Sequence, residues 1–221
     1  MDAFAPGLLS VAFAYLVGAV PFGYLVGRLV GKIDIRQHGS RNVGATNVAR
    51  TFGKFPGILA LLLDMAKGYG AVAFSRWLIG RPAWPLPLGV DTSPIHSRAF
   101  WVSLSALIAV LAHMYPVWLR FHGGKGVATA TGAFLALSPV VIAAGAIVFV
   151  IVILITRFVS LASILSASSI PLFFRYLTQE SLWTILVSIV IAITIILKHH
   201  SNIARLANGE ERRMGDGKDH D

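Results

Sequence analysis

A glycine-rich stretch near the middle of the chain, His113–Thr129, carries the residue types that bind an anion. Within it, Gly123-Gly124-Lys125-Gly126 combines backbone amides that no side chain covers with a single ammonium group. Uncovered amides and the N-terminus of a following helix both favour negative charge, so such a loop can hold a phosphate. The spacing is not that of a nucleotide-binding P-loop, because Gly126 stands where a Ser or Thr would follow the lysine. We therefore predict a phosphate site without nucleotide hydrolysis.

A second polar stretch, Gly39–Arg50, brings hydroxyl, amide and guanidinium groups together. Ser40 and Thr46 supply the hydroxyls, Asn42 and Asn47 supply the amides, and the terminal arginine is a bidentate partner for phosphate. A polar loop with helix-capping side chains would account for any one of these residues. The whole set beside a membrane segment favours a binding site.

Two ionisable residues, Asp64 and Lys67, stand three positions apart on one face of an apolar helix. At that depth in a membrane such groups face a cavity or one another. A buried structural pair and direct contact with substrate are therefore equally open. His113 likewise suits a packed histidine as well as a catalytic one.

Polar residues also gather near the C-terminal end of the chain. His199 lies one helical turn before Asn202, and Asn202 shares a helical face with Arg205. A basic amphipathic segment often only lies on a membrane surface, but this pattern also suits a site. Ser160 and Ser163 would by themselves be ordinary helix caps.

The composition indicates that membrane helices position these residues. Of 221 residues, 56% are hydrophobic and 13% are charged, and the mean hydropathy is +0.73; about a quarter of the residues of a soluble domain are charged. The net charge of +9 is better explained by basic loops that fix topology and meet membrane lipid than by nucleic-acid binding. Cysteine is absent, which excludes disulfides, thioester intermediates and thiolate metal sites.

We predict an all-α polytopic membrane protein with seven transmembrane helices, one of them short. The number depends on the apolar run 127–155, which Ser138-Pro139 divides into a half-length segment and a full helix. Counted once, this run would give six helices and place both chain ends on one side. Pro21 and Gly23 are expected to bend the first helix. The predicted helices are 6–30, 56–78, 99–119, 127–137, 139–155, 158–177 and 182–197.

The basic residues orient this arrangement in the membrane. Seven helices place 14 of the 19 basic residues on one side, Lys67 within the membrane, and Arg76, Arg81, Arg98 and Arg175 on the other side. Because basic loops favour the cytoplasm, we expect the N-terminus outside, the C-terminus inside and the polar glycine-containing segments facing the cytoplasm. The stretch 79–98 would be an external loop. Residues 1–211 are expected to form one membrane domain, followed by a disordered polar tail at 212–221.

The motifs together resemble those of the PlsY family, which are bacterial acyltransferases of the inner membrane. The first family motif, Gly-Ser-Gly-Asn-x-Gly-Ala-Thr-Asn with an Arg three residues on, matches Gly39–Arg50 except that Arg41 takes the third place. The second, a His before a Pro and then Gly-Gly-Lys-Gly-Val-Ala-Thr, matches His113, Pro116 and Gly123–Thr129.

The C-terminal half carries the rest of the resemblance. A Ser-Leu-Ala-Ser pattern matches Ser160–Ser163, and the third motif, His-x-x-Asn-Ile-x-Arg-Leu-x-x-Gly-x-Glu, begins at His199 and ends at Glu210 or Glu211. Asp64 and Lys67-Gly68 also resemble a family pattern in the second helix. The likeness extends from Pro21 to Glu211.

The resemblance implies an acyl-phosphate:glycerol-3-phosphate acyltransferase with seven transmembrane helices. In this family the 1-hydroxyl of glycerol 3-phosphate attacks the carbonyl of an acyl phosphate, giving lysophosphatidic acid and phosphate, without acyl-CoA or acyl carrier protein. Acyl phosphate, glycerol 3-phosphate and membrane lipid are thus the expected partners. We expect no cofactor, no metal and no nucleic acid, and the sequence gives no indication of oligomeric state.

The site residues follow from the motif matches and the chemistry above. By resemblance, the terminal Glu would be structural and the glycine loop would hold glycerol phosphate. The expected catalytic residues are Ser40, Arg50, Lys125, Ser163, His199 and Asn202. The expected substrate-binding residues are Gly39, Asn42, Gly44, Thr46, Asn47, Asp64, Lys67, His113, Gly123, Gly124, Gly126, Thr129, Ser160 and Arg205.

An acyl phosphate has a good leaving group, so the protein need mainly position two anions and screen their repulsion. Direct transfer is favoured over an acyl-enzyme, with either His199 or a phosphate oxygen of bound substrate as the base. A His-x-x-x-x-Asp pair, typical of acyl-CoA acyltransferases, does not occur. A transporter of a phosphorylated solute is the alternative, although no inverted repeat is visible. An alcohol phosphotransferase would need a carboxylate-rich metal motif, which is absent from the sequence.

Overall fold

The computed structural model describes residues 4–80 and 97–215, and all regular secondary structure within these ranges is helical. Most of the predicted external loop and the last residues of the predicted tail lie outside the described residues.

The first apolar run forms two helices, α1 (Phe4–Gly18) and α2 (Phe22–Val30), which together make one candidate membrane span. The bend predicted at Pro21 is confirmed as a break over Ala19–Pro21. Proline has no N–H for an intrahelical hydrogen bond, and its ring clashes with the preceding turn. Within the break, the Val20 carbonyl accepts a hydrogen bond from the Phe22 N–H at 3.1 Å and a second one from Lys67 on a later helix at 2.7 Å.

The polar segment after α2 contains helices that the sequence did not predict. A short 3-10 helix, η1 (Ile35–Gln37), precedes α3 (Ala45–Phe52). The next helix, α4 (Lys54–Ile79), begins directly after Gly53, whose φ of 96° lies in the left-handed region that glycine tolerates. The chain can therefore reverse sharply between α3 and the long α4.

The third predicted helix ends earlier than Leu119. α5 (Arg98–Met114) stops before Tyr115-Pro116, because a residue that precedes proline is disfavoured in the α conformation. A 3-10 turn, η3 (Val117–Leu119), and the glycine loop, which we define as residues 120–126, then lead into α6 (Val127–Leu137).

The predicted division of the long apolar run at Ser138-Pro139 is confirmed. α6 ends at Leu137 and α7 (Pro139–Thr156) begins two residues later, with Pro139 in its first turn and the Ser138 hydroxyl accepting from the Val141 N–H. α8 (Val159–Leu177), α9 (Leu182–Lys198) and α10 (His200–Ala207) complete the chain. α9 and α10 are bent by 57° with respect to each other at His199.

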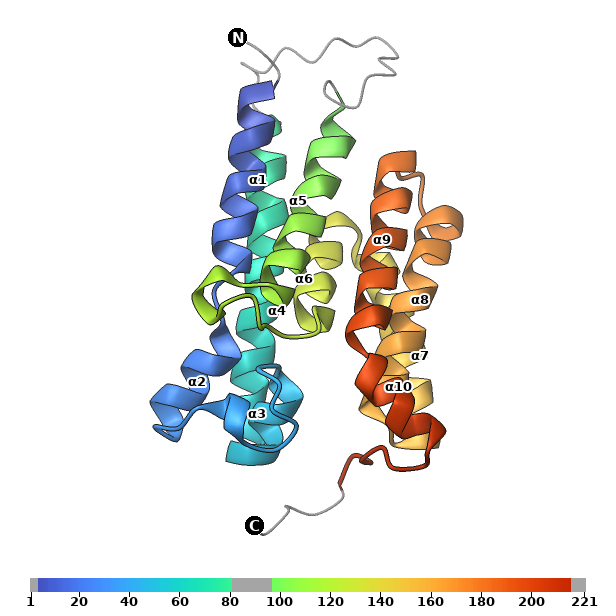
Figure 1. Ribbon diagram of the computed structural model, residues 1–221. Helices are drawn as coiled ribbons and strands as arrows, with labels where there is room; N and C mark the ends of the chain where they lie inside the picture. The colour runs from blue at the N-terminus through green and yellow to red at the C-terminus, as the bar shows by residue number, and fades with distance from the viewer. Residues whose placement is uncertain (1–3, 81–96, 216–221) are drawn as a thin grey trace.

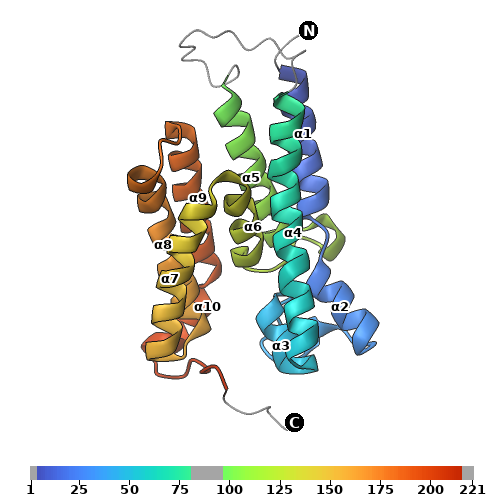
Figure 2. The same cartoon turned by 180° about the vertical axis from the view of Figure 1, so that it is seen from behind.

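The helices form two groups that lie side by side (Figures 1 and 2). One group contains α1, α4, α5 and α6, the other contains α7, α8 and α9, and α5–α9 and α6–α7 contacts join them. α1, α5, α7 and α9 run in one direction and α4, the shorter α6 and α8 run back, so α1 begins at one end of the bundle and α9 finishes at the other. The short helices α2, α3 and α10 all lie at that second end.

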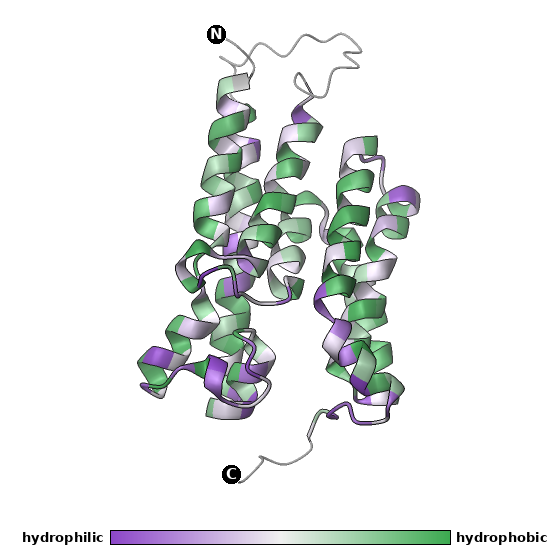
Figure 3. Ribbon diagram, viewed as in Figure 1, coloured by the Kyte–Doolittle hydropathy of each residue, from purple (hydrophilic) through white to green (hydrophobic). Residues whose placement is uncertain are grey.

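Apolar residues line the helices, and hydrophilic residues are concentrated at the end that holds α2, α3 and α10 and in the loop below α5 (Figure 3). Five of the described helical segments are long and apolar enough to cross a membrane, or six if α9 and α10 form one broken span, while α6 is shorter. The number of seven crossings and the side that each end faces stay predictions.

Close backbone contact joins α4 to α6 in the centre of the first group. A Cβ at Gly68 would lie 2.1 Å from the Thr129 carbonyl oxygen, and one at Gly132 would lie 1.9 Å from that of Met65. Small residues of this kind let membrane helices approach closely. This packing fixes α6, and with it the glycine loop, against the middle of α4.

Candidate active site

The side chain of Asn47 organises the loop that carries the first motif. It is 1% exposed, and its oxygen accepts a hydrogen bond from the Ser40 N–H at 2.8 Å. Its amide nitrogen donates to the carbonyls of His38 at 3.0 Å and Asn42 at 2.8 Å. The loop is thereby closed around one buried amide, which fixes the backbone on either side of Ser40.

This arrangement changes the expected role of two residues. Gly39 has φ +58°, and a Cβ there would lie 2.3 Å from the Asn47 oxygen. The polar atoms of Asn47 make hydrogen bonds inside the protein, and the backbone conformation at position 39 requires a glycine. Both therefore position the loop, and the direct substrate contact expected from sequence is not supported for them.

Other residues of the first motif remain accessible or cap the following helix. The Asn42 oxygen accepts from the Gly44 N–H at 2.8 Å, immediately before α3 begins. The side chains of Ser40 and Thr46 are exposed, and Arg50 is half-buried. Ser40, Thr46 and Arg50 are thus the members of this motif whose side chains suit contact with a ligand.

Glu211 is the centre of a hydrogen-bond network formed by the C-terminal motifs. Its side chain is 5% exposed. One carboxylate oxygen accepts from the Ser160 hydroxyl at 2.7 Å and from the Asn202 amide at 2.7 Å, and the other accepts from Arg205 at 2.8 Å. Glu210 is exposed, and among the described residues only its backbone N–H makes a hydrogen bond in this turn, to the Arg205 carbonyl. Glu211, and not Glu210, is therefore the structural glutamate that ends the third motif.

The network reaches the glycine loop through Asn202. The amide oxygen of Asn202 accepts a hydrogen bond from the Lys125 ammonium group. We call Lys125, Asn202, Glu211, Ser160 and Arg205 the Lys125 network. It links the two helix groups, because Lys125 precedes α6 while the other four residues come from α8, α10 and the segment after it.

Burial, hydrogen bonds and nearby charges together shift the pKa values of Glu211 and Lys125. Burial, which would raise the pKa of the Glu211 carboxyl, is outweighed by the hydrogen bonds from Ser160, Asn202 and Arg205, so that pKa lies below its ordinary value. Burial lowers the pKa of Lys125 to about 8; Glu211 opposes the shift, and the nearby charges of Arg205 and Arg50 add to it. Arg205 and Arg50 thus add positive charge to the surroundings of Lys125.

His199 occupies the bend between α9 and α10 and is 3% exposed. Its Nδ1 lies 2.7 Å from the Ile195 carbonyl oxygen. A carbonyl only accepts, so Nδ1 carries the hydrogen and Nε2 retains a lone pair. This tautomer suits a proton acceptor one helical turn before Asn202.

The glycine loop is folded back onto the end of α5. The N–H groups of Gly123 and Gly124 donate to the carbonyls of Met114 at 3.2 Å and His113 at 3.1 Å. The expectation that the amides of these two glycines cradle an anion is therefore not supported, since both are already engaged. The amides that follow Lys125, at the start of α6, stay suited to that role.

Behind the glycine loop, Asp64, Lys67 and His113 form a buried cluster. The Lys67 ammonium lies 2.8 Å from Asp64, 3.0 Å from His113 Nδ1 and 2.7 Å from the Val20 carbonyl oxygen in the α1–α2 break. A Cβ at Gly124 would lie 2.1 Å from His113 Nε2. The cluster therefore supports the loop from behind, and this packing favours the structural pair over direct substrate contact.

Two further predicted residues stand apart from the network. The Ser163 hydroxyl is buried and donates to the Val159 carbonyl of its own helix at 2.8 Å, which does not support the catalytic role expected for it. Thr129 is fully buried against α4, and its hydroxyl has no hydrogen-bond partner in the described part of the chain.

A cleft of about 470 Å³ opens beside the glycine loop. Arg36, Arg41 and Lys198 give it three cations, and Asp34, which is paired with Arg36 at 2.6 Å, gives it one carboxylate. We call it the basic cleft. The sequence interpretation missed these residues, although Lys198 directly precedes the third motif and the other two lie in the polar segment after α2. Of the predicted site residues, only Gly123 lines the cleft.

Comparison with known proteins places this geometry among membrane acyltransferases. A family model described as Glycerol-3-phosphate acyltransferase matches residues 8–209. A protein of Thermosynechococcus vestitus named glycerol-3-phosphate acyltransferase is 41% identical over 95% of this chain and 95% of its own.

Two solved structures are also similar. Both are crystal structures of PlsY, described as an integral membrane glycerol 3-phosphate acyltransferase. The glycerol 3-phosphate form has a TM-score of 0.82 and 38% identity and covers 95% of this chain and 96% of its own. The lysophosphatidic acid form has a TM-score of 0.79 and 37% identity, with 95% coverage of both chains.

Proposed function

This chain belongs to the glycerol-3-phosphate acyltransferase family, and we propose that it takes the acyl group from an acyl phosphate and uses the Lys125 network as its active site. It is a multi-pass membrane protein of bacterial type that acylates glycerol 3-phosphate to lysophosphatidic acid. We place it in the inner membrane, with the end that holds α2, α3 and α10 facing the cytoplasm. The concentration of basic residues at that end supports this orientation.

The reaction joins an oxygen to an acyl carbon and releases phosphate. The 1-hydroxyl oxygen of glycerol 3-phosphate attacks the carbonyl carbon of the acyl phosphate, and the bond from that carbon to the phosphate oxygen breaks. The leaving phosphate takes the bonding electron pair, and the hydroxyl proton ends on that phosphate. Neither a cofactor nor an external oxidant or reductant enters this balance.

The main obstacle is that both substrates carry phosphate groups that repel each other. The Lys125 network with Arg50 holds three cations and one carboxylate, and the basic cleft holds three cations and one carboxylate. Each region thus has a formal net charge of +2, which matches one phosphate dianion. The glycine loop contributes to both regions, so two dianions held there would be neighbours whose repulsion is screened.

The observation that carries this proposal is the hydrogen bond from Lys125 to Asn202, which is itself held by Glu211. It fixes the ammonium at the start of α6, where helix amides and Arg50 reach the same anion. Asn202 fixes the position of the cation before substrate arrives, which is what electrostatic catalysis requires. Either Nε2 of His199 or a phosphate oxygen of bound substrate takes the proton first.

The contacts of Ser40, the exposed serine among the proposed site residues, fit direct transfer of the acyl group from one substrate to the other. Within the described chain, no histidine or carboxylate makes a hydrogen bond to the Ser40 hydroxyl, so no base activates it as a nucleophile. Ser40 is better placed to donate a hydrogen bond to a phosphate oxygen. An acyl-enzyme intermediate is therefore not required.

The test is acyl transfer to labelled glycerol 3-phosphate by purified protein, with acyl phosphate and acyl-CoA offered separately. We expect lysophosphatidic acid from acyl phosphate alone, and loss of the product in Lys125→Ala. Lys54→Ala is the matched control, because Lys54 is an exposed lysine at the start of α4. Product from acyl-CoA alone would overturn the proposed donor. Saturable uptake of glycerol phosphate into vesicles without any product would favour the transporter instead.

A further inference from the structure

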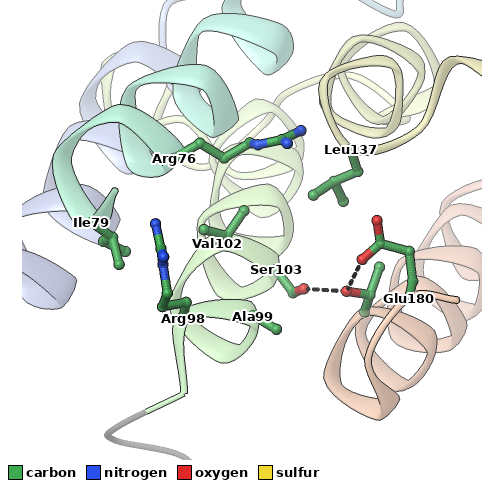
Figure 4. A pocket seen from close by; sticks show the side chains of 9 residues that line it. Arg76, Ile79, Arg98, Ala99, Val102, Ser103, Leu137 and Glu180 are labelled. Carbon is green, nitrogen blue, oxygen red and sulfur yellow. Dashed lines mark hydrogen bonds between the residues drawn. The ribbon is translucent and has the colours of Figure 1, made fainter. Parts of the chain in front are cut away.

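A second pocket lies at the end of the bundle opposite to the candidate active site. Its volume is about 240 Å³, and it lies between the C-terminal end of α4, the start of α5, the end of α6 and the start of α9 (Figure 4). The residues that give it its chemical character are Arg76, Arg98, Ser103, Glu180 and Thr184.

The short length of α6 explains why this pocket exists. Its 11 residues extend about 16 Å, roughly half of the hydrocarbon core of a bilayer. α6 ends at Leu137, which lines the pocket, whereas α4 and α5 continue past it (Figure 1). The space that a full-length helix would occupy is therefore left open between the neighbouring helices.

Two arginines bring positive charge to one side of this space. Arg76 donates a hydrogen bond to the Ala136 carbonyl in the last turn of α6, which uses one of its five N–H groups. Arg98 begins α5 and is exposed; in the described part of the chain it has no ion pair or hydrogen bond from its guanidinium. Its guanidinium lies beside the end of α4, near Gly80 and Ile79 (Figure 4).

A carboxylate stands on the other side. Glu180 accepts a hydrogen bond from the Thr184 hydroxyl at 3.3 Å, and Thr184 is joined to Ser103 on α5 at 3.1 Å (Figure 4). These contacts hold Glu180 on the α9 side of the pocket. No ion pair joins it to either arginine among the described residues, so opposite charges face each other across an open space.

The separation of charge indicates the class of ligand. Arginines bind phosphate oxygens through paired N–H groups, and a carboxylate suits an ammonium group. We propose that this pocket binds the headgroup of a zwitterionic membrane phospholipid, with the phosphodiester between Arg76 and Arg98 and the ammonium toward Glu180.

The position in the bundle supports this ligand. The pocket is open, lies near the ends of helices that qualify as membrane spans, and adjoins apolar residues such as Val102 and Leu137. The acyl chains of a bound lipid would extend along these apolar helix surfaces. Basic residues are scarce at this end of the protein, yet two of those described face this one space.

The test compares lipid binding by detergent-purified protein and its Arg98→Gln variant, using native mass spectrometry. Phosphatidylethanolamine, phosphatidylglycerol and inorganic phosphate are added separately. We expect phosphatidylethanolamine to bind the unmodified protein and to bind Arg98→Gln about tenfold more weakly. Arg175→Gln is the matched control, because Arg175 is exposed near the same end, on α8, and does not line the pocket. It should bind lipid as the unmodified protein does.

Further arms separate the lipid from simpler explanations. Glu180→Gln should weaken the binding of phosphatidylethanolamine more than that of phosphatidylglycerol, because phosphatidylglycerol has no ammonium group. Acyl transfer by Arg98→Gln should be unchanged, which also distinguishes this pocket from the active site. Equal lipid binding by Arg98→Gln and the unmodified protein would overturn the proposal. The proposal would also be overturned if inorganic phosphate bound as tightly as the lipid and lost as much affinity in Arg98→Gln. The site would then hold only a free anion.

Discussion

Lys125 and Asn202 are 77 residues apart in the chain and are joined by a hydrogen bond from the ammonium to the amide oxygen. Asn202 is itself held by Glu211, so the position of the cation depends on a carboxylate that does not touch it. The glycine loop and the C-terminal motif therefore act as one unit.

Asn202→Ala removes this link without removing a charge. We expect kcat to fall about tenfold to a hundredfold, because the variant loses a hydrogen bond to a charged group. Glu211 and Lys125 themselves are both retained. Steady-state acyl transfer at varied glycerol 3-phosphate measures this loss. Ser163→Ala removes a hydroxyl whose one hydrogen bond within the described chain is to its own helix, and it should stay within about twofold of the unmodified protein. A larger loss in Ser163→Ala than in Asn202→Ala would contradict this assignment.

The pKa of about 8 for Lys125 predicts a descending limb in the pH profile. The ammonium form binds the anion, and its fraction falls as pH rises through 8, so kcat/KM for glycerol 3-phosphate should fall about tenfold per pH unit above that value. The phosphate of the substrate ionises near about pH 6 and contributes nothing to this limb. In Lys125→Arg the residual activity should not fall near pH 8, because the guanidinium stays charged. A flat profile to pH 10 in the unmodified protein would rule out this role for Lys125.

Glu211 and Glu210 provide a matched pair of adjacent carboxylates. Glu211→Gln leaves Arg205 without its anion and places an amide NH₂ against a donor, either Arg205 or the pair Ser160 and Asn202. We expect a loss of about 2 kcal/mol in unfolding free energy, seen as a lower Tm in detergent. Glu210→Gln changes an exposed side chain and should leave Tm unchanged. Equal Tm values for the two variants would contradict the placement of Glu211.

The buried pair of Asp64 and Lys67 predicts a rescue. Their side chains are 2% and 1% exposed, so Asp64→Leu leaves an uncompensated buried cation and should lower unfolding stability by about 3 kcal/mol or more. Adding Lys67→Met removes that cation, and the double variant should recover most of the Tm. It should also retain acyl transfer, since the pair supports the glycine loop from behind. A stable but inactive double variant would instead indicate direct contact with substrate.

Arg41 stands at φ +59°, in the left-handed region that costs a residue with a Cβ about 1 kcal/mol relative to glycine. It is also the residue where this sequence departs from the family pattern, which has glycine. Arg41→Gly and Arg41→Ala both remove the guanidinium, so their difference isolates the backbone. We expect the glycine variant to have the higher Tm, by an amount equivalent to about 1 kcal/mol, and an equal or lower Tm would exclude strain at this position.

The sequence by itself determined the class of protein, the division of the long apolar runs into helices and the segments that carry the proposed site. These properties follow from local physics: apolar runs long enough for a bilayer, Pro21 and Ser138-Pro139 as helix breaks, and glycine-rich motifs that belong in no apolar helix. Helix α3 was missed because it is only eight residues long, and its few apolar residues, Ala45, Val48, Ala49 and Phe52, alternate with polar side chains that were assigned to a loop.

Only the tertiary structure decided what the individual side chains do. Asn47, Gly123 and Ser163 look like ligand contacts in the sequence, but each has its polar group engaged within the protein. Glu211 could be distinguished from Glu210 only by the donors that surround it, which come from α8 and α10. A hydrogen bond depends on distance and direction in space, and packing between helices far apart in the chain sets both.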